Sequence, residues 1–338
     1  MKKFLLFLLV VCAGAILWYK WELKAVGAPS DAEKKVPMMV RIEEGASVAE
    51  IADLLGEKDL IRSSLALRLY TRFHGMQADL KAGKFVFSRT MTVPEIVEVL
   101  RTGKSQQVIV TIPEGATLLD IERLLVEKGV TESGSLVSCA QTCDFSSFEF
   151  LPQAEGLAAR GGKLEGYLFP DTYYVDAGDF VSKFFLERLL TTFRHRVLDP
   201  YGEEIQKSER SLQDLMTMAS LVEEETRTEE ERPIVAGILW KRHDEGMGLG
   251  VDATVRYILD KPTGALTVSD LNVASPYNTR KFRGLPPGPI ANPGLQSILA
   301  ALRPSSSKYW YYLHDKKGVV HYAETNEEHN LNRMRYLQ

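Results

Sequence analysis

The sequence has few of the residues that mark several large classes of protein. It contains 3 cysteines and 6 histidines in 338 residues, and neither type shows the compact spacing of a metal site. It has no glycine-rich phosphate loop, no G-x-S-x-G elbow and no Cys-His nucleophile signature. Basic residues are not in excess either, since 41 of them face 45 acidic residues for a net charge of −4. We therefore expect no metal, no cofactor and no nucleic-acid partner.

The three cysteines divide into a lone residue and a close pair. Cys12 lies in an apolar run, whereas Cys139 and Cys143 form an isolated C-x3-C. In an oxidising compartment the pair can form a disulfide, and two small, reduced thiols explain the same spacing equally well. The sequence leaves both interpretations open.

The longest apolar run is at the N-terminus. Two lysines precede the apolar segment 4–19, and charged residues follow it from Lys20 onward. A membrane-spanning helix needs about 17–25 residues, and the aromatic residues at 18, 19 and 21 suit the lipid headgroups and extend its reach. We predict a single-pass inner-membrane anchor at residues 1–24. Its leading lysines place the N-terminus in the cytoplasm and the rest of the chain outside it.

Two processed forms would share this pattern. A cleaved signal peptide has the same charged start, but the segment 17–21 (LWYKW) offers no small-residue cleavage site. A lipoprotein would use Cys12, yet Val11 stands where a small residue is expected. A retained anchor is therefore the prediction, and the Gly- and Pro-containing segment 25–37 is expected to be a linker.

One sequence pattern occurs twice, at residues 40–58 and 110–128. Each copy has a short alternating strand, a Glu-Gly turn and a helix with apolar residues at i, i+3 and i+4. Two copies are too few for a solenoid. We therefore predict that each copy begins a subdomain.

The first subdomain is expected at 38–106 and the second at 107–338. The first has a β-α-α-β order that resembles LysM-like carbohydrate-binding modules, and a spacer or docking domain fits that order as well. The second combines long helices, loops and a hairpin near 309–323 without regular β-α alternation. Together they predict an α+β fold.

A run of three glutamates ends the predicted helix at 209–226. At about 100° per residue, Leu212, Met216 and Ala219 fall within about 40° of Glu223. Glu223 is therefore expected to point into an apolar face, where burial disfavours a charged carboxylate and suits a general acid.

The two following glutamates fall on other faces of that helix. Glu224 shares its direction with polar residues, and Glu225 lies beside Asp214. A solvated, glutamate-rich helix surface explains both of them well, and it explains Glu223 poorly. Glu223 is therefore the candidate catalytic residue.

Other polar residues are candidates for contact with substrate. A hydrolytic or inverting glycosidase would need a second carboxylate, for which Glu165, Asp171 and Asp252 are available, although Asp171 suits the bracing of a turn better. The loop 275–294 is rich in proline and glycine and can form a rigid cleft wall. Its residues Tyr277, Asn278 and Thr279 carry a flat ring and hydrogen-bonding groups that suit sugars, and packing of the core would explain them as well.

Four ordered motifs then resemble a known family. They are LEGYLFPDTYY at 164–174, ASLVEEET at 219–226, the loop at 275–294 and Glu328-His329-Asn330 near the end. They resemble the endolytic murein transglycosylases of the MltG, or YceG-like, family, over roughly residues 38–333. Tyr167, inside the first motif, is a further candidate for substrate binding.

The resemblance implies a non-hydrolytic cut between N-acetylmuramic acid and N-acetylglucosamine. The cut would leave 1,6-anhydromuramoyl ends on nascent strands and terminate their elongation. The family's catalytic glutamate corresponds to Glu223, which would protonate the leaving oxygen and then accept the proton of the muramic 6-hydroxyl. No second carboxylate is needed, because the sugar supplies the nucleophile. The implied partners are peptidoglycan strands and peptidoglycan synthases.

The chain departs from the family's pattern at LGVDATV, residues 249–255, which lacks the usual Gln and Pro but keeps Asp252, Thr254 and Val255. A substrate role for Asp252 depends on this segment, whereas the assignment of Glu223 does not. Two other functions remain to be separated by experiment. One is a non-catalytic glycan-binding scaffold of the divisome, and the other is a lysozyme-like hydrolase.

Overall fold

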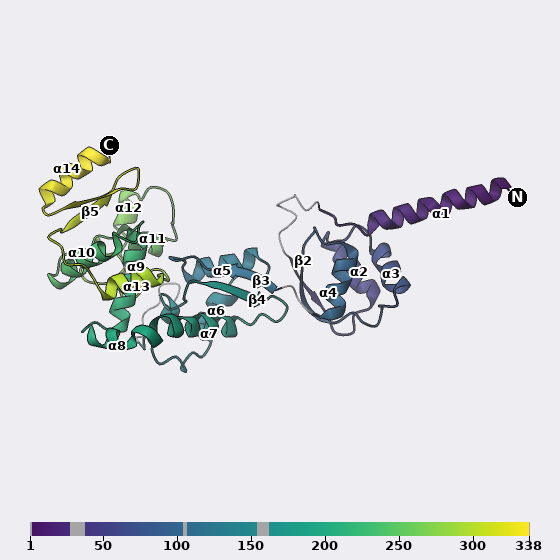
Figure 1. Cartoon of the computed structure of the whole chain (residues 1–338), viewed down its shortest axis with the longest axis horizontal. Helices are drawn as coiled ribbons and strands as arrows, with labels where there is room; N and C mark the ends of the chain where they lie inside the picture. The colour runs from purple at the N-terminus through teal and green to yellow at the C-terminus, as the bar shows by residue number, and fades with distance from the viewer. Residues whose placement is uncertain (1, 28–37, 104–106, 154–161, 338) are drawn as a thin grey trace. The chain divides into compact units, whose positions relative to one another are not determined.

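The computed structural model describes residues 2–27, 38–103, 107–153 and 162–337, which form two compact units (Figure 1). The first unit comprises Met1–Val110, Arg123–Ser133 and Tyr173–Val181, and the second comprises Thr111–Glu122, Gly134–Thr172 and Ser182–Gln338. Both contain helices and short strands, which confirms the predicted α+β class. Residues 28–37 of the expected linker lie outside the described residues.

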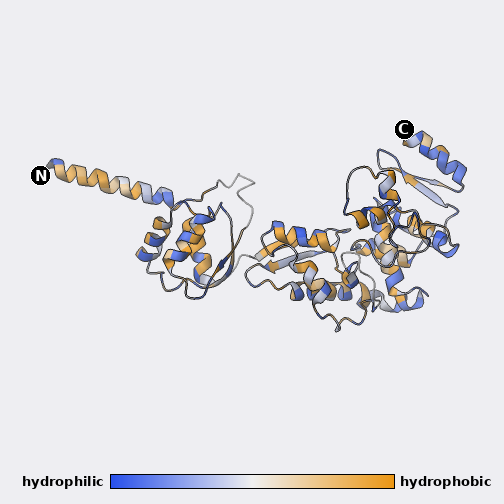
Figure 2. Cartoon of the chain, turned by 180° about the vertical axis from the view of Figure 1, so that it is seen from behind, coloured by the Kyte–Doolittle hydropathy of each residue, from blue (hydrophilic) through white to orange (hydrophobic). Residues whose placement is uncertain are grey.

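Helix α1 (Lys2–Glu22) contains the apolar run near the N-terminus (Figure 2). Its segment Lys3–Glu22 is long and apolar enough to cross a membrane, and none of its most apolar stretch is buried in the protein. Length and composition alone support an anchor here.

Residues 38–103 have the predicted β-α-α-β order, followed by the helix expected from Val93. Strands β1 (Met38–Ile42) and β2 (Gly83–Phe87) pair antiparallel, with Met38 opposite Phe87 and Ile42 opposite Gly83. Helices α2 (Val48–Glu57), α3 (Ser64–Phe73) and α4 (Val93–Thr102) pack on them. Capping boxes at Ser47 and Thr92 satisfy backbone donors where α2 and α4 begin.

The second copy of the repeat has the same local structure. Strand β3 (Gln107–Thr111) pairs with β4 (Thr172–Asp176), and helix α5 (Leu118–Glu127) follows. Thr117 and Asp120 exchange side chain–backbone hydrogen bonds at the start of α5, as Ser47 and Glu50 do at the start of α2. The repeat therefore predicts the same local structure in both places.

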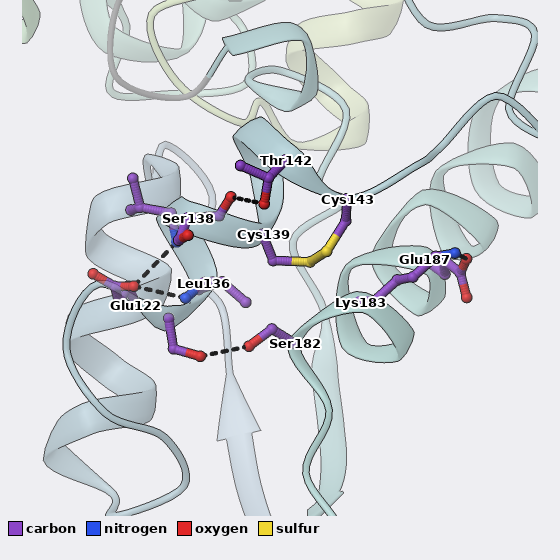
Figure 3. Close-up of a disulfide and its surroundings, with 11 residues drawn as sticks. Glu122, Leu136, Ser138, Cys139, Thr142, Cys143, Ser182, Lys183 and Glu187 are labelled. Carbon is purple, nitrogen blue, oxygen red and sulfur yellow. Dashed lines mark hydrogen bonds and ion pairs between the residues drawn. A yellow bond between two sulfur atoms is a disulfide. The ribbon is translucent and has the colours of Figure 1, made fainter.

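A disulfide links Cys139 to Cys143 at the end of helix α6 (Ser135–Thr142) (Figure 3). The start of α6 is held by the buried Glu122, whose Oε1 accepts the backbone N–H groups of Leu136 and Val137 at 2.8 and 3.1 Å. The structure therefore favours the bridged alternative, which fits an oxidising compartment.

The second unit is mainly helical. Its remaining elements are a 3-10 turn (Gly162–Leu164), α7 (Ser182–Phe193), a π-helical turn (Arg194–Leu198), α8 (Asp199–Lys207), α9 (Leu212–Glu225), α10 (Arg232–Asp244), α11 (Asp252–Leu259), α12 (Val268–Leu271), α13 (Leu295–Leu302), the hairpin of β5 (Tyr311–His314) and β6 (Val320–Ala323), and α14 (Asn326–Tyr336).

Helix α9 lies at the centre of this unit and contacts α10, α11 and α13. Because neighbours surround it, every residue from Leu215 to Val222 is buried, including Thr217 and Ser220. The prediction of one apolar face and one polar face was therefore wrong for the middle of this helix.

Candidate active site

Glu223 lies in the last turn of α9, and its side chain is 9% exposed. Its Oε2 accepts the backbone N–H of Gly294 at 2.9 Å, and its Oε1 lies 3.5 Å from Nη2 of Arg232. The carboxyl group is thus shielded from bulk water and held by two polar partners. The side chain is largely buried, as the sequence predicts, but its immediate neighbours are polar rather than apolar.

A second carboxyl group shares the same guanidinium. Oε2 of Glu114, in the turn of the second repeat copy, lies 3.8 Å from Nη2 of Arg232. Partial burial and then the charge of Glu223 raise the pKa of Glu114. A Cβ added at Gly294 would collide with the Glu114 carboxyl, so a glycine is needed for this close approach.

Glu224 faces a cavity of ≈ 220 Å³, which Glu165, Arg256 and Tyr257 also line. Enclosure of its carboxyl, followed by the charges of Glu223 and Asp120, raises the pKa of Glu224 to about 7, although part of the residue is open to solvent. The residue as a whole is exposed, as predicted for a solvated helix surface, and the cavity beside its carboxyl is what the sequence did not predict.

Glu225 was also expected to face water, and this was wrong. Burial of its carboxyl raises the pKa of Glu225 to about 7, and Oε2 accepts the hydroxyl of Tyr312 at 2.9 Å. Strand β5 covers this end of α9, which sequence periodicity cannot show. The three glutamates of the run therefore have three different surroundings.

Asn292 joins the segments around the cluster. Its Oδ1 accepts the backbone N–H groups of Gly166 and Leu168, each at 2.9 Å. Its Nδ2 donates to the Ala116 carbonyl at 2.8 Å and to Oε1 of Glu165 at 3.0 Å. The fully buried Asn292 thus fixes the loop that supplies Gly294 to Glu223.

The predicted Glu165 is part of this framework. It is 2% exposed and accepts the Leu118 backbone N–H at 3.0 Å and the Tyr257 hydroxyl at 3.2 Å. Burial raises the pKa of Glu165 to about 7. Its oxygens are engaged within the protein, so the structure supports a framework role for Glu165 beside the cavity.

Four other candidate binding residues are buried. Tyr167 lies among aromatic rings, and Tyr277 packs on Tyr257. Asn278 donates to two backbone carbonyls, and Thr279 bonds to the start of α11. Tyr277, Asn278 and Thr279 therefore help to hold the loop 275–294 in place. We therefore do not propose Tyr167, Tyr277, Asn278 or Thr279 as direct sugar contacts.

The two candidate aspartates lie nearer the surface. Asp252 forms an ion pair with Arg280 at 2.5 Å. The side chains are 51% and 42% exposed, so both are accessible from solvent. Oδ1 of Asp171 accepts the N–H of Thr172, and its Oδ2 pairs with Arg196 at 3.2 Å. Asp171 therefore braces a turn, as expected.

Comparison with known proteins gives this site its context. A family model described as YceG-like matches residues 40–335. This chain belongs to the YceG-like family. It is 31% identical over 337 residues to an endolytic murein transglycosylase from Bacillus subtilis (strain 168), covering 97% of this chain and 91% of that one. It is 30% identical to the protein of the same name from Streptococcus pneumoniae serotype 2, covering 98% of this chain and 64% of the relative.

A solved structure of a YceG-like protein from Listeria monocytogenes is also similar. The two chains are 30% identical and superpose with a TM-score of 0.58, covering 88% of this chain and 99% of that one. The shared fold therefore extends over most of both chains.

Three of the four motifs that suggested the YceG-like family meet at this site, through Glu165, Glu223 and the loop that ends at Gly294. The fourth lies in α14, where His329 stacks on Tyr311 with ring centroids 5.2 Å apart.

Sequence reasoning missed the importance of Arg232, Glu114 and Asn292. Glu114 was visible in the repeat and Asn292 in the Pro- and Gly-rich loop, but nothing local marked either as a neighbour of Glu223. Arg232 begins α10 directly after a run of acidic residues, and its pairing depends on tertiary structure. Among the described residues, no group of three or more His, Cys, Asp or Glu side chains is arranged to hold a metal ion.

Proposed function

We propose that this chain is an endolytic peptidoglycan lytic transglycosylase with Glu223 as its catalytic acid and base. The names of its relatives support the reaction class. The observation that carries the residue assignment is the cluster in which Glu223 and Glu114 share Arg232 and Glu224 extends into a cavity.

The cluster can hold a proton near neutral pH. Burial and the nearby carboxylate raise the pKa of Glu114, and the pKa of Glu224 rises to about 7. Protonated carboxyl groups are therefore available in the cluster beside Glu223.

The reaction would then need no water. Glu223 would protonate the oxygen between C1 of N-acetylmuramic acid and N-acetylglucosamine as the C1–O bond breaks. The muramic 6-hydroxyl would attack C1, form the 1,6-anhydro bond and return its proton to the Glu223 carboxylate. The Gly294 N–H, at 2.9 Å, would fix the direction of the carboxyl throughout.

The surroundings suggest where substrate lies and where the enzyme works. We propose that glycan approaches the cavity beside Glu224, and that the accessible Asp252 is a peripheral contact. We also propose that α1 anchors the protein in the inner membrane with its N-terminus in the cytoplasm, so that the catalytic unit meets nascent strands and their synthases. The disulfide fits this location. A LysM-like role in glycan binding is proposed for residues 38–106 on the order of their elements alone.

Replacement of Glu223 by Gln tests the assignment. We expect cleavage of uncrosslinked glycan to fall by at least roughly 10²-fold, the low end for loss of a positioned acid or base. The exposed Glu230, replaced by Gln, is the matched control and should keep wild-type activity. If Glu223→Gln keeps both its fold and its activity, the proposed chemistry is wrong, and a glycan-binding scaffold becomes the better explanation.

A further inference from the structure

One face of helix α3 exposes large apolar side chains. Leu65 is 53% exposed and Phe73 is 71% exposed. With Leu69 and Arg72 they occupy positions i, i+4, i+7 and i+8, which share one side of a helix. The buried residues of α3, among them Leu67, point to the core instead. We call Leu65, Leu69, Arg72 and Phe73 the α3 face.

The α3 face lies beside the end of the candidate membrane helix. The rings of Tyr19 and Phe73 meet edge-on with centroids 6.1 Å apart. The guanidinium of Arg62, just before α3, lies 4.5 Å from the ring centroid of Trp21. The α3 face therefore meets the end of α1 through Phe73 and Tyr19, and the two helices lie next to each other in Figure 1.

The segment after α1 is fixed to the first unit. The Leu23 carbonyl accepts the Val93 N–H at 3.0 Å, and the Gly27 N–H donates to the Arg89 carbonyl at 2.6 Å. Arg62 donates to the Ala25 carbonyl at 2.9 Å. The part of the expected linker that is described, residues 25–27, is therefore bound to the domain, and the α3 face keeps a set position relative to α1.

This geometry sets the depth of Phe73 if α1 spans a membrane. A helix rises about 1.5 Å per residue, so about 20 residues cross a hydrocarbon layer of about 30 Å. The candidate span is Lys3–Glu22, so Tyr19 lies near its outer boundary, where aromatic side chains are favoured. A side chain in contact with Tyr19 lies at the same boundary.

We infer that the α3 face, together with Arg62, is a membrane-binding surface that rests on the outer leaflet of the bilayer. Leu65 and Phe73 would enter the headgroup region, and the exposed Arg62 and Arg72 would face lipid phosphates. This inference rests on the proposed anchoring by α1. Contact with that apolar helix and the flanking basic residues favour lipid over a protein partner as the occupant.

Nitroxide labels can measure the depth of each position in the full chain. The free Cys12 of wild type reports on α1, and the Cys12→Ser, Phe73→Cys variant reports on the α3 face. The matched control is Cys12→Ser, Lys84→Cys, which places the label on an exposed residue of strand β2. Each protein is placed in nanodiscs that contain anionic phospholipid, and collision rates with oxygen and with a polar nickel chelate are compared.

We expect the ratio of oxygen to nickel collisions to be highest at Cys12, severalfold lower at Phe73 and lowest at Lys84. Equal ratios at Phe73 and Lys84, with Cys12 in the bilayer, would overturn the inference and leave the anchor intact. A water-like ratio at Cys12 would instead refute the anchoring itself. A Phe73 label that neither reagent reaches would mean that protein, such as a second copy of the chain, covers the face, and this too would overturn the inference.

Discussion

The two copies of the repeat share a local structure and differ in what surrounds them. In both, a strand leads to a Glu-Gly turn, with Gly45 and Gly115 each at φ +80°, and then to a helix capped by a hydroxyl side chain. Both copies bury the matching isoleucines of their helices, Ile51 and Ile121.

The turns themselves have different neighbours. A Cβ at Gly45 would meet nothing within 4 Å, whereas one at Gly115 would lie 2.9 Å from Oε1 of Glu224. The Gly115 N–H also donates to the Asn292 carbonyl. The comparison shows that a short sequence pattern fixes local geometry, while the rest of the fold decides whether that geometry serves a reaction.

The largest effect on stability is expected at Asn292, which connects the Glu114-Gly115 turn of the second repeat copy to its surroundings. Asn292→Ala removes buried hydrogen bonds to Gly166, Leu168, Ala116 and Glu165. Unpaired buried polar groups cost about 1–3 kcal/mol each, so the free energy of unfolding should fall by about 3 kcal/mol or more in chemical denaturation. The exposed Asn272, replaced by Ala, should change it by less than about 0.5 kcal/mol. Equal stabilities would show that the second turn is not held by this loop.

Replacement of the matching glutamates of the two turns, Glu44 and Glu114, should have different effects on activity. Glu114→Gln removes a negative charge beside Glu223 and Arg232, and we expect glycan cleavage to slow by about tenfold, equivalent to about 1.4 kcal/mol. Glu44→Gln changes the exposed counterpart and should leave the rate unchanged. Similar cleavage rates for the two variants would show that Glu114 has no part in the reaction.

Replacement of the matching glycines, Gly45 and Gly115, distinguishes the effect of backbone strain from the effect of contact with the site. Gly45→Ala and Gly115→Ala both force a side chain into the left-handed region, so each should destabilise the protein by about 1–2 kcal/mol in denaturation. Only Gly115→Ala also pushes on Glu224, and only it should slow cleavage, by severalfold. Loss of activity in Gly45→Ala as well would mean that strain alone is responsible.

The smallest effect is expected in the pH dependence. Because the pKa of Glu224 is raised to about 7, the cluster holds more protons below that pH and fewer above it. Activity that needs a proton donor should therefore fall as the pH rises through about 7. In Glu224→Gln the cluster loses both the group that holds a proton up to about pH 7 and its negative charge, so the fall should move to lower pH. An unchanged rate profile would show that Glu224 does not influence the reacting proton.

Much of the local structure was predictable, and most of the tertiary environment was not. The repeat, the position of α9 and the hairpin follow from patterns that extend over a few residues. The surroundings of Glu225 depend on Tyr312, far away in the sequence, and those of Glu223 depend on Arg232 and Gly294. Periodicity assumes one buried face, and it failed on α9 because helices pack around it.

Two of the candidate binding residues, Asn278 and Thr279, also depend on the tertiary structure. The side chains of Asn278 and Thr279 suit sugars chemically, but the fold uses them to bind its own backbone. Residue type shows what a group can bind, and burial decides whether it is free to do so.

The most direct test of the proposed reaction is the mass of the new chain ends made by the full-length protein from uncrosslinked glycan. Intramolecular attack by the 6-hydroxyl predicts anhydromuramoyl ends, one water lighter than reducing ends, and their loss in Glu223→Gln. Reducing ends from the wild-type protein would show that water is the nucleophile, and they would contradict the account.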